Sequence, residues 1–129
     1  MIIKLPLPPR DKKGRSILSP NTQSHWRVKA NAKKLYKEQA NVAVLVMLDG
    51  NYPPLYEQGR ITFHWYHRTG HRMDVDNLNA TMKSAIDGIV QGGIFTDDRY
   101  LTYGDPVQYT DKDNPRIEVE FSHCDWKTG

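Results

Sequence analysis

Two long segments of the chain repeat apolar residues every three or four positions, the spacing of one helix face. The first extends from residue 25 to about residue 48 without glycine or proline, and the second from about residue 77 to residue 91. Asn21 or Ser24 is available to cap the first helix, and Gly92-Gly93 ends the second. The residues expected to be buried are Val28, Ala32, Leu35, Gln39, Val42 and Val46 in the first helix, and Leu78, Met82, Ala85, Ile86 and Ile89 in the second.

Four other segments alternate apolar with polar residues or are rich in β-branched and aromatic residues, which predicts strands. Residues 60–68 are the best example, with Ile61, Phe63 and Trp65 expected on one face. The other expected strands are residues 1–7, 100–109 and 116–121. This order of elements predicts an α+β fold in which two α-helices pack on one face of a small mixed β-sheet.

The chain of 129 residues is long enough for one domain with a modest core and too short for two. We therefore expect a single domain over residues 1–129, with a basic mobile loop at 10–19 and a C-terminal tail at 123–129. No segment is apolar enough to span a membrane. The lone cysteine, Cys124, excludes an internal disulfide and a CxxC zinc motif, so the cytoplasm is the expected compartment.

The net charge of +3 hides a strong asymmetry along the chain. Residues 1–37 carry ten lysines and arginines against one acid, which gives +9, and the remaining residues carry eight bases against fourteen acids, which gives −6. A basic arm joined to an acidic body suits an enzyme that binds nucleic acid with the first and a metal ion with the second. The alternative is that the two parts only neutralise each other in the folded protein.

The acidic part contains the cluster Asp74-Val75-Asp76-Asn77-Leu78 and, 19 residues after Leu78, the pair Asp97-Asp98. Carboxylates this close repel each other, and a divalent cation such as Mg²⁺ would relieve the repulsion. In extended backbone, Asp74 and Asp76 would point to one side and Val75 into the core. Asp97 or Asp98 would join them if the glycine turn folds the chain back. The alternative for Asp76 is a helix N-cap, which accounts for one aspartate of the two.

Lys83 follows Asp76 by seven positions, so the two residues are about 20° apart on a helical wheel. A cation there could stabilise the charge that develops on a scissile phosphate. The alternative is an i,i+4 pair with Asp87, which stabilises a helix only slightly. Other chemistries lack their motifs in the sequence: no calcium loop follows Asp74, no Gly-x-Ser-x-Gly occurs, and the five histidines lack zinc spacing, with His64 and His67 expected at a strand surface.

These residues together resemble the RusA family of Holliday-junction resolvases, including its prophage-borne members. The core of the match is Asp74-Val75-Asp76-Asn77-Leu78, Lys83, Asp87-Gly88-Ile89, Gly93-Ile94-Phe95 and Asp97-Asp98. A second block, Leu18-Ser19-Pro20-Asn21 with His25-Trp26-Arg27 before a lysine-rich helix, is similar to the N-terminal part of the phage-type members. The chain departs from some members at Ala80, where their lysine follows the second aspartate by four residues.

The resemblance implies a homodimeric endonuclease that uses Mg²⁺ or Mn²⁺ to nick four-way DNA junctions symmetrically, in DNA recombination and repair. It implies that Asp74, Asp76 and Asp98 bind the metal and are catalytic, with Asp97 as a further metal candidate, and that Lys83 is the catalytic lysine. Asp87 would belong to the helix structure. The residues expected to contact DNA are Arg10, Lys12, Lys13, Arg15, Asn21, Trp26, Arg27, Lys29, Lys33 and Arg72, with Arg72 near the scissile phosphate and Trp26 either stacked on a base or buried in the core.

Two other functions stay open on the sequence. A non-catalytic DNA-binding module would keep the fold and the basic arm, but it would be expected to have lost an aspartate, and this chain has not. A metal nuclease that acts on flaps, other branched DNA or RNA would need the same carboxylates as a junction resolvase.

Overall fold

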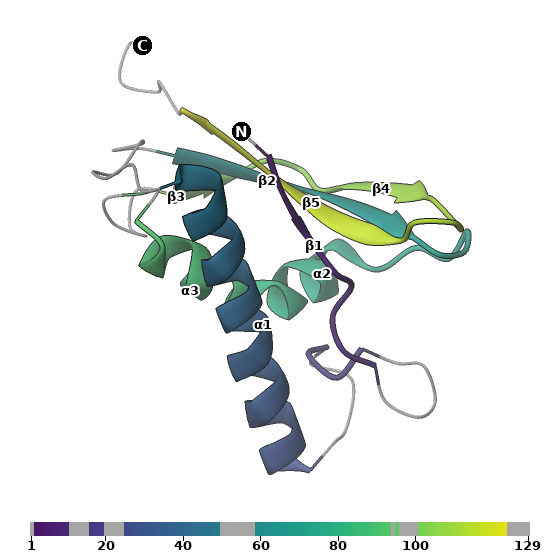
Figure 1. The fold of residues 1–129 in the computed structure, drawn as a ribbon. Helices are drawn as coiled ribbons and strands as arrows, with labels where there is room; N and C mark the ends of the chain where they lie inside the picture. The colour runs from purple at the N-terminus through teal and green to yellow at the C-terminus, as the bar shows by residue number, and fades with distance from the viewer. Residues whose placement is uncertain are drawn as a thin grey trace.

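The structure is a computed structural model that describes residues 2–10, 16–19, 25–49, 59–93, 95 and 101–123. Along the chain its elements are β1 (Ile2–Leu5), α1 (Trp26–Leu48), β2 (Gly59–His67), α2 (Val75–Thr81), α3 (Lys83–Gln91), β3 (Leu101–Tyr103), β4 (Val107–Thr110) and β5 (Arg116–His123). The described helices lie on one side of a mixed sheet (Figure 1). The predicted α+β class is confirmed.

The central strand of the sheet is β2. One edge of β2 pairs antiparallel with β5, which in turn pairs antiparallel with β1. The other edge carries two short parallel partners, β3 beside residues 59–61 and β4 beside residues 64–67. The single strand expected over residues 100–109 is therefore wrong, because the chain leaves the ladder at residues 104–106, where Pro106 lacks a backbone N–H.

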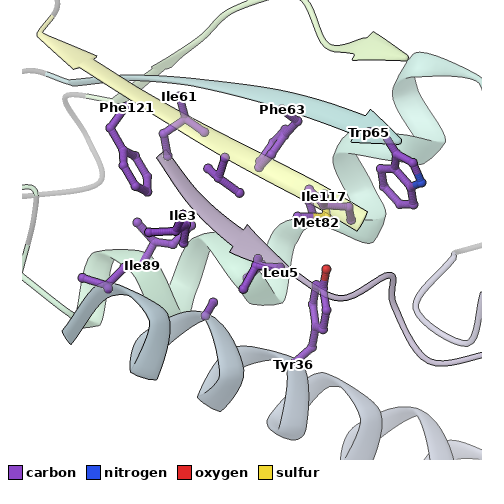
Figure 2. Packing of buried hydrophobic residues seen from close by; sticks show 14 of the residues in the cluster. Ile3, Leu5, Tyr36, Ile61, Phe63, Trp65, Met82, Ile89, Ile117 and Phe121 are labelled. Carbon is purple, nitrogen blue, oxygen red and sulfur yellow. The ribbon is translucent and has the colours of Figure 1, made fainter. Parts of the chain in front are cut away.

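The core lies between the sheet and the helices, and the predicted alternation of β2 is confirmed. Ile61, Phe63 and Trp65 are all buried on the face toward the helices. His67 continues the same face and is buried too, so its expected place at a strand surface is wrong. The rest of the layer comes from Ile3 and Leu5 of β1 and from Ile117, Val119 and Phe121 of β5, packed against Met82, Ile89 and Tyr36 of the helices (Figure 2).

The buried stripe of α1 differs from the predicted one. The buried residues recur every four positions and are mostly small: Ala32, Tyr36, Ala40, Val44 and Leu48. Tyr36 is fully buried, and its hydroxyl donates a 2.8 Å hydrogen bond to the carbonyl oxygen of Pro6. Of the predicted stripe, only Ala32 is buried; Gln39 is intermediate, and Val28, Leu35, Val42 and Val46 are exposed. The sequence offers two apolar stripes on this helix, and the buried one is the stripe whose Ala40 and Val44 pack on the glycines Gly88 and Gly92 of α3.

The ends of α1 use other residues than expected. The N-cap is His25, whose Nδ1 accepts a 3.2 Å hydrogen bond from the backbone N–H of Arg27. The predicted caps, Asn21 and Ser24, lie outside the described residues. Asp49 ends the helix in the left-handed conformation, with φ of 49°, and its N–H donates to the carbonyl of Leu45.

The second predicted helix begins earlier than expected and is divided in two. Helix α2 starts at Val75 rather than Asn77, and Met82 separates it from α3 with φ of −86° and ψ of 0°. The hydroxyl of Thr81 donates a 2.8 Å hydrogen bond to the carbonyl of Asn77, four residues earlier. Side chains that bond this carbonyl often bend helices, which accounts for a break at this position. The predicted apolar stripe is buried in both parts, except for the partly buried Ile86.

Glycines on α3 let it approach α1 closely. A Cβ added at Gly88 would overlap the backbone carbonyl of Lys37, and one at Gly92 would overlap the side chain of Val44. The amide of Asn41 also donates to the carbonyl of Gly88, at 3.2 Å. The two glycines are one helical turn apart, so they form a flat strip along which α1 packs.

Replacing Gly88 with alanine is expected to lower the free energy of unfolding by about 1–3 kcal/mol, the usual cost of overpacking. The same change at an unconstrained helix position would be stabilising. Urea denaturation measures the difference, with Gly70→Ala as the matched control, because a Cβ at Gly70 meets nothing within 4 Å. A Gly88→Ala protein as stable as the wild type would contradict this packing.

Candidate functional site

The two aspartates of the Asp-Val-Asp-Asn cluster lie at the start of α2. Asp74 is the N-cap residue, with extended φ and ψ of −61° and 138°, and its carbonyl accepts a 2.9 Å hydrogen bond from the N–H of Leu78. Asp76 lies in the first helical turn. Val75 is helical and 46% exposed, so the expectation of an extended segment with Val75 in the core is wrong. The N-cap expected at Asp76 belongs to Asp74 instead.

Both carboxylates are free to bind a cation. Asp74 and Asp76 are exposed, and Asp74 makes no side-chain capping bond. Neither forms an ion pair with another described residue. The positive end of the helix dipole favours acidic groups here but leaves their oxygens open on the solvent side. Mg²⁺ is typically held by one or two carboxylates together with water and substrate phosphate, so this pair fits such an ion.

The predicted third and fourth ligands, Asp98 and Asp97, lie outside the described residues. The nearest described residues along the chain are Phe95 and Leu101, and both lie near Gly59. The ring of Phe95 occupies the space that a Cβ at Gly59 would need, and Leu101 pairs with Gly59 in the sheet. Asp74, in contrast, follows the opposite end of β2. Among the described residues, no group of three or more histidines, cysteines or acids could hold a metal. The joint ligation of one ion by Asp74, Asp76 and Asp98 stays a prediction.

Lys83 opens α3, and its described partner is Asp87. The Lys83 Nζ lies 3.8 Å from Asp87 Oδ1, and the lysine side chain is 80% exposed. An exposed pair of this kind contributes little stability and is easily exchanged for another partner. Asp87 thus has the helix role expected for it, and within the described residues no ion pair joins Lys83 to Asp74 or Asp76.

The two blocks of sequence that carry the resemblance meet in space. The hydroxyl of Ser19 donates a 2.8 Å hydrogen bond to Oδ1 of Asn77, across 58 residues of sequence. Leu18 and Ser19 are both buried, and Arg10 pairs with Ser16 in an isolated antiparallel bridge. The end of the expected mobile loop, at Ser19, is therefore held against the aspartate segment; Lys12, Lys13 and Arg15 lie outside the described residues.

Gln108 on β4 holds the backbone just before Asp74. Its Oε1 accepts a 2.8 Å hydrogen bond from the N–H of Met73, and its Nε2 donates a 3.0 Å bond to the carbonyl of Met73. His67 Nε2 lies 2.7 Å from the same Oε1, so it must donate. Burial lowers the pKa of His67, an effect that the hydrogen bond to Gln108 opposes. Sequence reasoning missed this role of both residues. Gln108 lies in a short strand and belongs to no motif, and His67 was expected at a strand surface.

Arg72 lies two residues before Asp74 in an exposed loop. Its guanidinium donates to the hydroxyl of Thr110 at 3.1 Å and to the carbonyl of His71 at 3.2 Å. Both partners are neutral, so the positive charge of Arg72 is not compensated by an acid among the described residues. The arginine is therefore held in place with its charge available to an anion near the aspartates.

Several predicted DNA contacts share the start of α1. Trp26 is 68% exposed, so the alternative that it belongs to the core is wrong. Its ring stacks on His25 at 5.8 Å, and the guanidinium of Arg27 lies 5.3 Å from its centroid. Lys29 and Lys33 follow on the next two turns. Asn21, the remaining predicted contact in this region, lies outside the described residues.

A separate polar network covers the sheet face that points away from the helices. His64 contacts the hydroxyl of Tyr109 at 3.0 Å and a carboxylate oxygen of Glu120 at 2.8 Å. Arg116 stacks on the ring of Tyr66 at 3.8 Å and pairs with Asp111 and Glu118. These groups satisfy one another across neighbouring strands, so they serve to stabilise the sheet.

A scan of the chain against protein-family models and a search of curated proteins found no match. The resemblance to the RusA family therefore depends on the motif residues themselves and on their placement. No helix in the described part of the chain has both the length and the apolar character that crossing a membrane would need.

Proposed function

We propose that this protein is a Mg²⁺-dependent endonuclease that resolves four-way DNA junctions by paired nicks, acting in the cytoplasm in recombination and repair. The observation that carries the proposal is the hydrogen bond from Ser19 to Asn77. It joins the Ser-Pro-Asn block to the Asp-Val-Asp-Asn block, and these are the two independent parts of the resemblance. Beside it, Asp74 and Asp76 present two exposed carboxylates without described partners.

Each residue of the candidate site has its own proposed role. Asp74 and Asp76 would hold the cation, which supplies positive charge at the scissile phosphate and promotes ionisation of the attacking water. Gln108 fixes Met73 and thereby the start of the aspartate segment. Arg72 offers its charge to a phosphate oxygen nearby. Lys83 can leave its weak, exposed pair with Asp87 when a phosphate approaches, as the role of catalytic lysine requires.

Two observations favour this function over its alternatives. A non-catalytic binding module would gain nothing from two carboxylates without described partners beside a DNA-binding surface, because without a cation they repel phosphates. Neutralisation of the basic arm by the acidic body is also not seen along α1, because the ion pairs of the described residues involve neither Arg27 nor any lysine of this helix. Flaps and other branched nucleic acids remain the second candidate substrates, since they need the same ligands.

Cleavage of a labelled synthetic four-way junction tests the activity, with linear duplex and flap substrates run in parallel. We expect symmetric paired nicks with Mg²⁺ and none with EDTA. Asp74→Asn and Asp76→Asn should each reduce the rate at least about 100-fold, comparable to removing one electrostatic stabiliser from an active site. Asp113→Asn, at an exposed residue of the turn before β5, is the matched control. Tight junction binding without metal-dependent cutting would contradict the proposal, and cutting of flaps alone would favour the second candidate.

Paired nicks require two active sites related by two-fold symmetry, and we propose that a second copy of the chain supplies the other one. An exposed apolar stripe on α1 supports this: Val28, Leu35 and Val42 are spaced by seven residues and continue into Leu45 and Val46. Spacings of seven and of three or four fit the seam between paired helices. Residues 38–48 include no lysine or arginine, so this part of the stripe suits an apolar partner rather than DNA.

Sedimentation analysis tests the dimer. The wild type should have a mass near twice 14.9 kDa, and the double variant Val42→Glu/Val46→Glu should have the monomer mass because charges would enter the helix seam. Val107→Glu, at an exposed apolar residue of β4, is the control and should stay dimeric. A wild-type monomer, or a dimer that the α1 variant leaves intact, would contradict this interface.

A further inference from the structure

A basic cleft lies between α1 and the α2–α3 pair. Its volume is about 770 Å³, and five lysines line it: Lys29, Lys33, Lys34, Lys37 and Lys83. Asp87 is its one acidic residue among those described. Leu18 and Ala80 also line it. Since Ser19 bonds Asn77 and Ala80 follows Asp76 by four residues, about 6 Å along the helix, the cleft adjoins the aspartate segment.

The arrangement of these lysines is unfavourable without an anion. Lys29, Lys33 and Lys37 are four positions apart, so they are stacked as like charges along one side of α1. Lys29 also lies in the first turn, at the positive end of the helix dipole, and this turn carries no acid. Within the described residues, none of the four α1 lysines has an ion-pair partner. A bound anion would remove both penalties.

A buried hydroxyl in the cleft is also without a partner. Ser84 lines the cleft beside Lys83, and its Oγ is inaccessible to solvent with no hydrogen-bond partner among the described residues. A hydroxyl can donate to a phosphate oxygen, and leaving it unbonded in a buried place costs free energy. Ser84 thus adds a hydroxyl without a described partner to the residues that line the cleft.

We propose that this cleft binds the phosphodiester backbone of one nucleic acid strand and leads it to the aspartate segment. The row from Lys29 to Lys37 is about 12 Å long. That length matches three to four nucleotides of one strand at about 3.4 Å each, which is more than a single phosphate occupies. The choice of DNA as the ligand rests on the proposed function, but binding in the cleft requires neither metal nor cleavage.

The cleft and the dimer stripe can be used at the same time. Lys33 and Leu35 are about 160° apart around the axis of α1. Lys29, Lys33 and Lys37 lie on one flank of the helix, and Val28, Leu35, Val42 and Val46 lie about 100° or more away from them. Pairing of two copies through the stripe would therefore leave both clefts open to DNA.

Fluorescence anisotropy in EDTA tests the inference, with a labelled single strand and its duplex. Lys33→Gln/Lys37→Gln should weaken binding and lower the slope of log affinity against log salt by about 1.4 for the single strand, for two lost phosphate contacts. Lys4→Gln/Lys112→Gln, which removes two exposed lysines outside the cleft, is the matched control and should change the slope less. Circular dichroism and urea denaturation establish that each variant is folded.

Two results would overturn the inference. One is a slope and affinity in the cleft variant equal to those of the control. The other is that inorganic triphosphate binds the cleft and the labelled strand does not, which would make the ligand a small polyphosphate. Cleavage is scored separately. If the cleft variant binds the strand more weakly but the wild type cuts no DNA, only the nuclease proposal is contradicted. If the cleft variant binds and cuts as the wild type does, only the cleft proposal is contradicted.

Discussion

The contact of α3 with α1 at Gly88 is the constraint on which the rest of the arrangement depends. Because an added Cβ would overlap the Lys37 carbonyl, the two helices can approach this closely only with glycine on α3. The approach buries Ala40 and Val44 of α1 and leaves Val28, Val42 and Val46 exposed. It also sets the basic cleft beside α2, whose first turn carries the aspartates. This one contact thus determines which side of α1 is buried in the core and places the cleft beside the candidate metal ligands.

The electrostatics of the site follow from the separation of its charges. Two exposed acids, Asp74 and Asp76, lie at the start of α2, and the lysines of α1 line the cleft next to it. If these acids and lysines formed ion pairs with each other, the acids could not bind a cation and the lysines could not bind phosphates. Because they do not pair within the described residues, one set remains available for a cation and the other for phosphates. Recognition by backbone phosphates positions a nucleic acid without reading its sequence, which suits an enzyme that selects a branched shape.

The fold was largely predictable from the sequence, and the details of the site were not. Strand β2 alternates strictly, so Ile61, Phe63 and Trp65 were placed correctly. Helix α1 carries two apolar stripes, and only the glycines of a distant helix decide between them. Thr81 breaks the second helix through a hydrogen bond that periodicity does not encode. Gln108 lies 35 residues from Met73, so no local pattern could reveal its role. The motif singled out Asp74 and Asp76, but the expected extended segment is a helix start, with Asp74 as the N-cap of α2 and Asp76 in its first turn.

In the proposed enzyme, Asp74 and Asp76 hold a divalent cation. The most direct test is a titration with Mn²⁺, followed through the backbone amide signals in an NMR spectrum. We expect the paramagnetic ion to broaden the signals of residues 74–78 first, and we expect Asp74→Asn/Asp76→Asn to abolish this selective broadening while the spectrum remains that of a folded protein. Broadening that begins elsewhere in the chain, or that is unchanged in the variant, would contradict cation binding by these aspartates.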